Sequence, residues 1–247
     1  MDTLLKPLLL LPWPDWLALV LFFAGWSGYA HWARQRAQLR PSILATTNQW
    51  RRRWMLQATF RDNRIVDSAV TQSLSASPQF FASTSILIIG GLLAALGATD
   101  KASGLVQEIP FAARTSALVF DLKLALLAAI FVHAFFRFTW SLRQYSFGAI
   151  IVGAAPEAKQ FTGMDDAQRE LFADRAGRVM GLAAETFNDG LRAYYMSFAA
   201  VAWFFSAWAF MAATAAVLVV LYRREFRSEV LLALREGLGP IQPPTPP

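Results

Sequence analysis

Long uninterrupted apolar stretches constrain the fold of this chain more than any other feature. A helix rises about 1.5 Å per residue, so roughly 20 apolar residues cross a hydrocarbon core about 30 Å thick. Apolar residues make up 55% of the sequence, which exceeds what soluble domains normally carry. We therefore predict an all-α fold, a polytopic transmembrane helical bundle. Its four apolar segments lie at about residues 16–33, 80–98, 118–140 and 193–222.

The positions of the arginines predict how the chain is oriented. Eight arginines follow the first apolar segment, between residues 34 and 64, whereas the loop after the second segment carries only Lys101 and Arg114 as positive charges. Lys and Arg accumulate on the cytoplasmic side of membrane proteins. We therefore predict an inner-membrane protein with a periplasmic N-terminus and large basic loops in the cytoplasm. The net charge of +6 is attributed to this topology, and no nucleic-acid partner is expected.

The basic stretches between the apolar segments contain apolar residues at helical spacing, which predicts amphipathic cytoplasmic helices at about 40–79 and 143–192. One of these, at about 165–188, should pack against the basic stretch before the second span. Asp62 is placed to cap the helix that follows it. We treat residues 1–236 as a single membrane domain and the proline-rich residues 237–247 as an extended tail.

The last apolar segment, 193–222, would measure about 45 Å as one straight helix, longer than the hydrocarbon core. A single tilted helix would leave Arg223 and Arg224 in the periplasm. A hairpin that turns near Ser206 would return them to the cytoplasm, as the charge rule prefers. We favour the hairpin, although each arm would be short.

Ionisable residues in the third span are the sharpest functional candidates, because charges within a membrane commonly mark ion or proton paths. His133 and Arg137 share a helical face, and either mark such a path or serve structure, with Arg137 ending the span at the headgroups. Asp121 and Lys123 either form an entrance ring of an oligomer or lie at the outer interface with Lys123 extended outward. We favour the structural interpretation of both pairs. Arg143 follows as a further polar candidate.

Small residues in the second span predict close helix packing. Gly90 with Ala94, and Gly91 with Ala95, lie one turn apart, a spacing that lets two helices approach closely in lipid.

The run Arg51-Arg52-Arg53 has two compatible interpretations. It serves as a topology signal, and it also offers a contact for anionic lipids at the cytoplasmic face or for an acidic patch of a partner.

Catalytic chemistry finds little support in the sequence. The chain has no cysteine and two histidines, and it lacks a phosphate-binding glycine loop, a nucleophile elbow and a zinc motif. We expect no enzyme activity, no metal and no cofactor.

Six segments between about residues 50 and 230 have a recognisable composition. They are Asn63-Arg64-Ile65-Val66-Asp67, Phe81-Ala82-Ser83-Thr84, Phe138-Thr139-Trp140-Ser141-Leu142-Arg143-Gln144-Tyr145, Gly153-Ala154-Ala155-Pro156, Gly190-Leu191-Arg192-Ala193-Tyr194-Tyr195 and Leu221-Tyr222-Arg223-Arg224-Glu225-Phe226. Together they resemble segments of the domain of unknown function 599 family. The resemblance implies a bacterial inner-membrane helical protein and supplies no catalytic residue. In that family a His-Pro pair tends to precede the tryptophan of the last apolar segment, whereas this chain has Ser206-Ala207, which counts against a hairpin.

Two hypotheses for function follow. The first is an accessory or structural subunit that packs against other membrane protein subunits or against itself. The alternative is a homo-oligomeric ion channel or small-solute transporter with His133 and Arg137 near the path.

Overall fold

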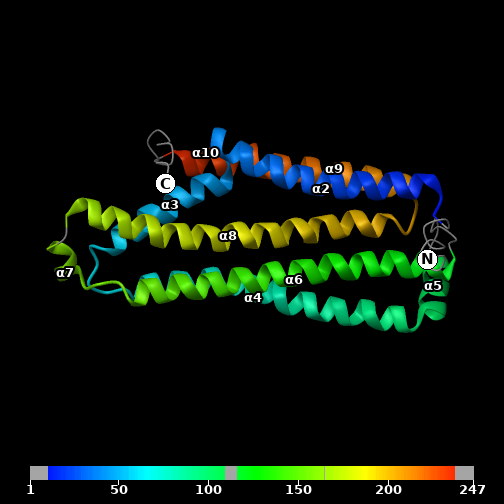
Figure 1. Ribbon diagram of the computed structural model, residues 1–247, viewed down its shortest axis with the longest axis horizontal. Coiled ribbons are helices and arrows are strands. Elements are labelled where there is room, and N and C mark those ends of the chain that lie inside the picture. The colour runs from blue at the N-terminus through cyan, green and yellow to red at the C-terminus, as the bar shows by residue number, and fades with distance from the viewer. Residues whose placement is uncertain (1–10, 109–115, 164, 237–247) are drawn as a thin grey trace, which may run out of the picture. The chain divides into compact units, whose positions relative to one another are not determined.

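The computed structural model describes residues 11–108, 116–163 and 165–236, and every regular element in these ranges is a helix (Figure 1). The all-α prediction is therefore confirmed. The predicted proline-rich tail, 237–247, lies outside the described residues. The helices are α2 (Trp13–Leu39), α3 (Ile43–Ala58), α4 (Ile65–Gly97), α5 (Thr99–Gln107), α6 (Ala117–Gly153), α7 (Ala158–Thr162), α8 (Asp166–Ala202), α9 (Ala207–Phe226) and α10 (Glu229–Arg235).

Polar side chains fix where several helices begin, because they bond the N–H groups that the first turn leaves unsatisfied. Asp165 accepts a hydrogen bond from the N–H of Gln168 at 2.7 Å, and the Gln168 side chain accepts one from the N–H of Asp165 at 3.3 Å. This reciprocal pair starts α8. At α4, the side chain of Asn63 accepts from the N–H two residues on, at 2.9 Å. The residue that bonds the start of this helix is therefore Asn63 and not the predicted Asp62.

Three described helices are long and apolar enough to cross a membrane: α4, α6, and the stretch Ala207–Arg235 that begins with α9. This corrects the predicted count of four. The first predicted segment, 16–33, lies in α2, but residues such as Trp26, Tyr29 and His31 make it less apolar than the other three.

The last predicted segment, 193–222, is divided by a short turn. Here α8 ends at Ala202, and Ser206 accepts a hydrogen bond at 3.0 Å from the N–H three residues on to start α9. Trp203 stacks on Phe210 at 5.4 Å between ring centres, so the two helices fold back on each other, where the yellow ribbon passes into orange in Figure 1. The helix break that the predicted hairpin needs is therefore present, although no proline lies at the turn.

The predicted borders between membrane and cytoplasmic segments do not coincide with helix ends. The borders near residues 80, 140 and 192 all fall inside continuous helices, namely α4, α6 and α8. Each of these helices combines a polar stretch with an apolar one, so hydropathy changes along them while the helical hydrogen bonds continue.

The chain divides into two compact units, and α2, α4, α6, α8 and α9 supply residues to both. The first, which we call the apolar unit, has six basic and six acidic residues and is therefore neutral. The second, the charged unit, has 17 of the 23 Lys and Arg residues and 11 of the 17 acidic residues, and so carries the whole net charge of +6. The apolar unit comprises Met1–Trp32, Ser77–Trp140 and Thr186–Leu221, and the charged unit comprises Ala33–Ala76, Ser141–Glu185 and Tyr222–Pro247.

An aromatic cluster packs α4, α6 and α8 together in the apolar unit. The ring of Phe81 stacks on that of Phe138 at 5.3 Å and meets that of Tyr194 edge-on at 5.3 Å. The Tyr194 hydroxyl also bonds Ser85 at 2.9 Å. A Cβ atom at Gly190 would lie 2.5–2.9 Å from ring atoms of Phe138, so glycine allows this close approach of α6 and α8.

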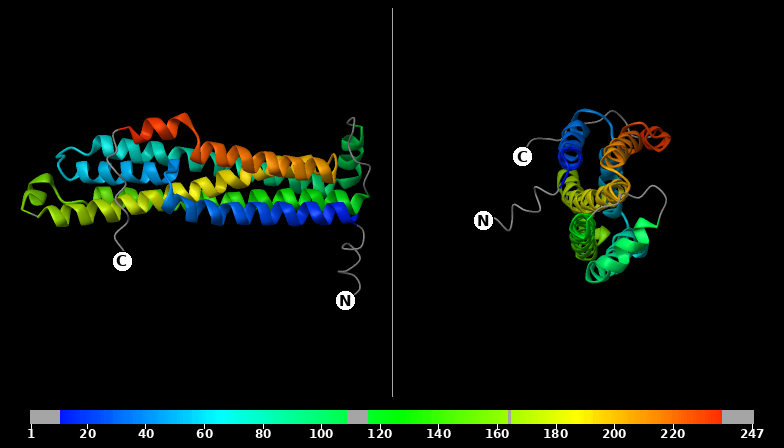
Figure 2. Two further views of the ribbon diagram at one scale, coloured as in Figure 1. Left: turned by 90° about the horizontal axis from the view of Figure 1, so that it is seen from above. Right: turned by 90° about the vertical axis from the view of Figure 1, so that its right-hand side faces the viewer.

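The helix α2 lies beside α9 in the apolar unit, and Figure 2 shows the pair from two directions. The rings of Phe22 and Phe210 lie 5.0 Å apart, and Phe22 is fully buried. A Cβ atom at Gly25 would lie 3.0 Å from the side chain of Leu218, so the two helices pack closely here as well.

In the charged unit α3 packs against α8, which confirms the predicted contact between the basic stretch and the helix at about 165–188. Arg52 on α3 forms an ion pair with Asp174 on α8. Cβ atoms added at Gly177 and Gly181 would lie 2.9 Å from the backbone of Arg52 and 3.0 Å from the side chain of Asn48, so both glycines let α3 come near. This packing positions the arginines of α3.

Candidate functional site

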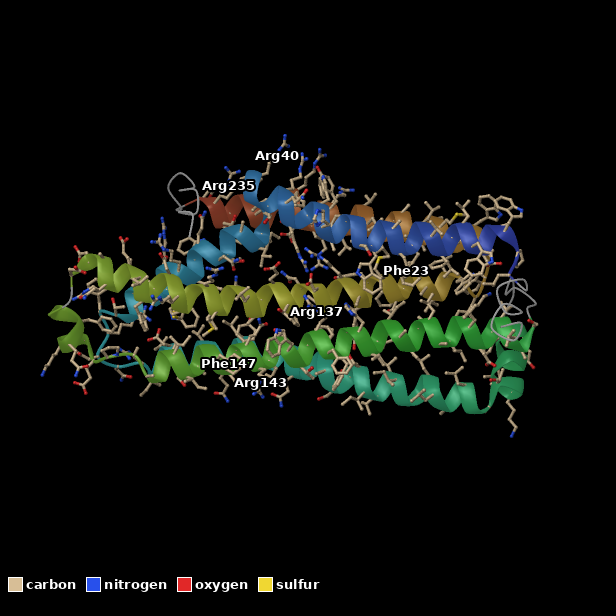
Figure 3. The ribbon with its side chains drawn as sticks, in the orientation of Figure 1. Phe23, Arg40, Arg137, Arg143, Phe147 and Arg235 are labelled. Atoms are coloured by element: carbon tan, nitrogen blue, oxygen red, sulfur yellow. The ribbon has the colours of Figure 1, made fainter. Side chains whose placement is uncertain are left out.

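An ionic cluster joins α6 to α8 within the apolar unit. Arg137 on α6 donates through Nη2 to Oδ2 of Asp189 on α8, and Arg192 donates through Nη1 to Oδ1 of the same carboxylate at 3.0 Å. The side chains of Asp189 and Arg192 are each 9% exposed, and that of Arg137 is 32% exposed. Figure 3 shows Arg137 on α6, turned toward α8. One carboxylate is thus held by two guanidinium groups, which leaves one net positive charge.

Aromatic residues of α2 contact this cluster. The ring centre of Tyr29 lies 5.8 Å from the guanidinium carbon of Arg192, within the range of a cation–π contact. Trp26 meets the imidazole of His133 edge-on at 5.6 Å. His133 precedes Arg137 by one helical turn, and the His133 residue is exposed at the surface of α6. The structure therefore gathers the two predicted residues of α6 with α2 and α8.

Charge neutralisation explains the arrangement. A buried ion is costly unless it is paired and hydrogen bonded, and the cost is greatest where no water is present. Both oxygens of Asp189 accept from a guanidinium, while Arg137 Nε is buried and has no acceptor in the described part of the chain. The evident chemical capacity of the cluster is to hold α6 and α8 together through charge-assisted bonds.

Lys123, predicted to extend outward, is buried instead. Its side chain is covered by aromatic rings, with Nζ at 5.5 Å from the ring centre of Trp203 and 5.7 Å from that of Phe204. Asp15 accepts a hydrogen bond from the indole N–H of Trp203 at 2.5 Å. The sequence could not show this pocket of rings, because it is assembled by the turn between α8 and α9, far from Lys123 along the chain.

Asp121 is tied to a neighbouring helix. Its carboxylate accepts a hydrogen bond from the hydroxyl of Thr99, at the start of α5, at 2.6 Å. Asp121 and Lys123 therefore each have contacts inside the apolar unit, and the structure does not pair them with each other.

The small residues predicted to pack helices lie on the surface of α4. Gly90, Gly91 and Ala94 are exposed, and Ala95 is half-buried. No atom outside the local backbone comes within 4 Å of a Cβ atom added at either glycine. This face is therefore unused by the described part of the chain.

The three consecutive arginines on α3 make different contacts. Arg51 donates to Thr47 at 3.0 Å and to Asn48 at 2.8 Å, and Arg52 contacts Asp174 and, at 3.8 Å, Glu170. Burial lowers the pKa of Arg51 below its ordinary value, and the nearby hydroxyl of a tyrosine on α6 acts in the opposite direction. Two of the three side chains thus serve packing of the charged unit.

The remaining members of the predicted set are exposed. Arg53 lies over the ring of Trp50 at 5.3 Å, and Arg143 lies over that of Phe147 at 5.5 Å. Figure 3 shows Arg143 and Phe147 on the same side of α6. No group of three or more His, Asp or Glu side chains that could hold a metal ion occurs among residues 11–108, 116–163 and 165–236.

The family described as "Protein of unknown function, DUF599" matches residues 17–230. The chain belongs to this family. No curated protein and no solved structure matches it.

The segments that carry the DUF599 resemblance meet in pairs within the two units. In the charged unit, Arg64 donates to the carbonyl of Ala155 at 2.5 Å and to that of Pro156, where α6 has ended. In the apolar unit, Phe138 contacts Gly190 and Tyr194. The family-like segments are therefore the places where helices are joined.

Sequence reasoning missed three important residues of this DUF599 chain. Asp189 and Arg192 precede the apolar run that starts at residue 193, so hydropathy assigned them to the cytoplasmic stretch. Their spacing of three, directly before that run, was the available signal. Asp67 is fully buried and accepts bonds from Trp54 and Arg61, each at 2.7 Å. It ends a segment that carries the family resemblance, but the sequence did not predict these bonds.

Removal of the Asp189 carboxylate should destabilise the DUF599 chain strongly. D189L leaves two arginines without their counter-ion in the apolar unit, so we expect a loss of about 3–5 kcal/mol of unfolding free energy. The double variant D189L/R192M should recover part of this loss, because it removes one of the stranded charges. Tryptophan fluorescence during denaturation in mild detergent measures both. The exposed substitution R178Q is the control and should change stability by less than about 0.5 kcal/mol. A D189L variant as stable as R178Q would contradict the proposed role of the cluster.

Proposed function

We propose that this DUF599 protein is a non-catalytic accessory or structural subunit that packs against another membrane protein chain. The observation that carries the proposal is the exposure of α4, one of the three helices apolar enough to cross a membrane. Only 11% of its most apolar window is buried by the rest of the chain. The exposed side of this window includes both members of the pair Gly90 and Ala94.

The composition of this face favours a helix of another subunit over lipid chains. Glycine within a helix destabilises it by about 0.5–1 kcal/mol relative to alanine, and contact with lipid chains does not offset this loss. Packing against a partner helix does offset it, because small residues one turn apart let two backbones approach closely. The open space next to Gly90 and Gly91 is compatible with such an approach.

The internal pairing of intramembrane charges also supports a structural role. Asp189 joins Arg137 and Arg192, and Lys123 is enclosed by aromatic rings. A transport path needs ionisable groups that face water during the cycle. These groups instead contact one another or neighbouring helices of the same unit.

The proposed location is the bacterial inner membrane, with the N-terminus in the periplasm and the charged unit in the cytoplasm. The separation of charge supports it, because the charged unit carries the full +6 and the apolar unit is neutral. The positive-inside rule then assigns the charged unit to the cytoplasm.

Single-cysteine labelling tests this orientation directly, because the natural chain has no cysteine. Ser73 lies in the charged unit and Lys101 on α5, and both are exposed. A membrane-impermeant maleimide should label K101C in cells with a permeable outer membrane, and S73C only after the inner membrane is broken. The natural chain should stay unlabelled. Labelling of S73C in intact spheroplasts would refute the orientation.

Bulky substitutions on the exposed face of α4 should remove the partner. G90L/A94L fills that face without meeting the rest of the chain, so we expect unchanged membrane levels but a particle reduced to the single chain. Native nanodiscs extracted directly from membranes, followed by mass photometry, measure this. The matched control A125L/A129L adds the same kind of bulk to two exposed small residues one turn apart on α6 and should keep the complex. A natural chain that is already monomeric in such nanodiscs would count against a subunit role.

Transport remains a second candidate function because His133 is exposed on α6 one turn before Arg137. In a homo-oligomer, this imidazole would face either lipid or a shared path. An imidazole in water changes charge near neutral pH, so a wet path that includes one would conduct in a pH-dependent way.

Reconstituted vesicles separate the two functions. On the structural proposal, vesicles that contain the natural chain should show no ion or solute flux beyond that of empty vesicles between pH 5 and 8. A flux that varies over this pH range and disappears in H133F would replace the structural proposal by the transport one.

A further inference from the structure

An arginine-rich surface lies on the charged unit where α2 ends, where α9 ends and on α10. Five of its six side chains are exposed, and that of Arg36 is half-buried. Figure 3 shows two of them, Arg40 and Arg235, on the same side of the ribbon and pointing away from it. We call this set the arginine surface: Arg36, Arg40, Arg223, Arg224, Arg227 and Arg235.

Specific bonds through α3 bring these chain segments together. The side chain of Glu225, at the end of α9, accepts a hydrogen bond from the N–H of Leu44 in the first turn of α3 at 3.2 Å. The indole N–H of Trp50 donates to the carbonyl of Leu234 on α10 at 2.9 Å. Because Arg40 lies three residues before Ile43, the first residue of α3, all three arginine-bearing segments are connected to this helix.

The surface keeps a positive charge however its side chains pair. Residues 33–42 and 222–236 contain seven arginines and three glutamates. One further arginine in this stretch, Arg34, pairs with Glu185 at 3.4 Å, and counting that glutamate still leaves an excess of three positive charges. One of the glutamates, Glu225, also bonds the backbone of α3.

Apolar side chains accompany these charges. Val230 and Leu232 of α10 are 59% and 61% exposed, whereas Leu231 between them is buried. Trp50 is also exposed, at 40%. Arginine next to exposed aliphatic and tryptophan side chains is the composition of surfaces that lie at the interface between water and lipid.

The distance along the helices sets the depth of these arginines. The apolar part of α9 ends at Leu221, so Arg223 and Arg224 follow it by about 3 and 4.5 Å of helix. The headgroup layer on each side of the hydrocarbon core is about 5–8 Å thick. If the apolar unit spans the hydrocarbon, these guanidinium groups reach the lipid phosphates.

We infer that the arginine surface binds the headgroups of anionic phospholipids. This inference rests on the bilayer location proposed above and not on any partner chain. It moves the lipid contact away from Arg51 and Arg52, whose guanidinium groups are engaged within the charged unit. Guanidinium groups suit this ligand because they form paired hydrogen bonds with phosphate oxygens.

Native mass spectrometry of the purified full-length chain in mild detergent tests the inference. The probes are phosphatidylglycerol and phosphatidylcholine with identical acyl chains. The test variant is R40Q/R223Q/R227Q/R235Q. The matched control, R143Q/K159Q/R175Q/R178Q, removes the same number of exposed charges from the same unit. Tryptophan fluorescence during heating reports whether each variant is folded.

The natural chain should bind phosphatidylglycerol at least about tenfold more tightly than phosphatidylcholine, since each arginine near a headgroup contributes about 1 kcal/mol. The test variant should lose at least about tenfold of its affinity for phosphatidylglycerol, whereas the control should stay within about threefold of the natural chain. Equal losses in both variants would overturn the inference, because binding would then follow net charge alone. So would equal binding of the two lipids.

Single substitutions keep the test decisive if the fourfold variant unfolds. R40Q and R235Q each change one exposed side chain and should each weaken phosphatidylglycerol binding about fivefold, with phosphatidylcholine binding unchanged. Single-substitution affinities equal to that of the natural chain would overturn the inference. Because this measurement needs neither a partner nor an intact cell, its failure is distinct from failure of the subunit proposal or of the orientation.

Discussion

The carboxylate of Asp189 holds two arginines that hydrocarbon could not solvate, and the packing of the apolar unit depends on it. Arg137 reaches it from α6, and Arg192 reaches it from one turn further along α8. This fixes the register of the two helices and places Gly190 against the ring of Phe138. The same register positions Tyr194 for its bond with Ser85, which attaches α4. A charge that would be a liability in lipid thus aligns three helices.

Arginine has two different tasks in the charged unit. Arg52 and Arg64 act within the unit, one in an ion pair across the α3–α8 contact and the other on carbonyl groups past the end of α6. The arginines at the ends of α2 and α9 and on α10 are in excess over their acidic neighbours. The first group adds polar contacts to an apolar cluster that includes Met55, Tyr145 and Met180, and the second explains why the unit is so basic.

Local sequence patterns predicted what depends on neighbours along the chain, and failed where distant contacts decide. Hydropathy predicted helices and membrane character, and the apolar stripe of α8 predicted its packing on α3. Hydropathy could not place Asp189, because its partner Arg137 is 52 residues away. Hydropathy also left open whether the last apolar segment is one helix or a hairpin, because the chain lacks the proline that would indicate a helix break. The break is set by Ser206, whose hydroxyl caps α9 after the last turn of α8 tightens.

Helix length explains why the borders of the predicted spans do not coincide with the ends of helices. The helix α4 has 33 residues and α6 and α8 have 37 each, so they extend over about 50 and 55 Å, whereas the hydrocarbon core is about 30 Å thick. A helix of either length that crosses this core along the bilayer normal has about 20 Å or more outside hydrocarbon. The polar parts of the same three helices supply residues to the charged unit. The extra helix length therefore does not require a separate soluble domain. The change from apolar to polar composition along one helix consequently marks a change of solvent and not the end of a structural element.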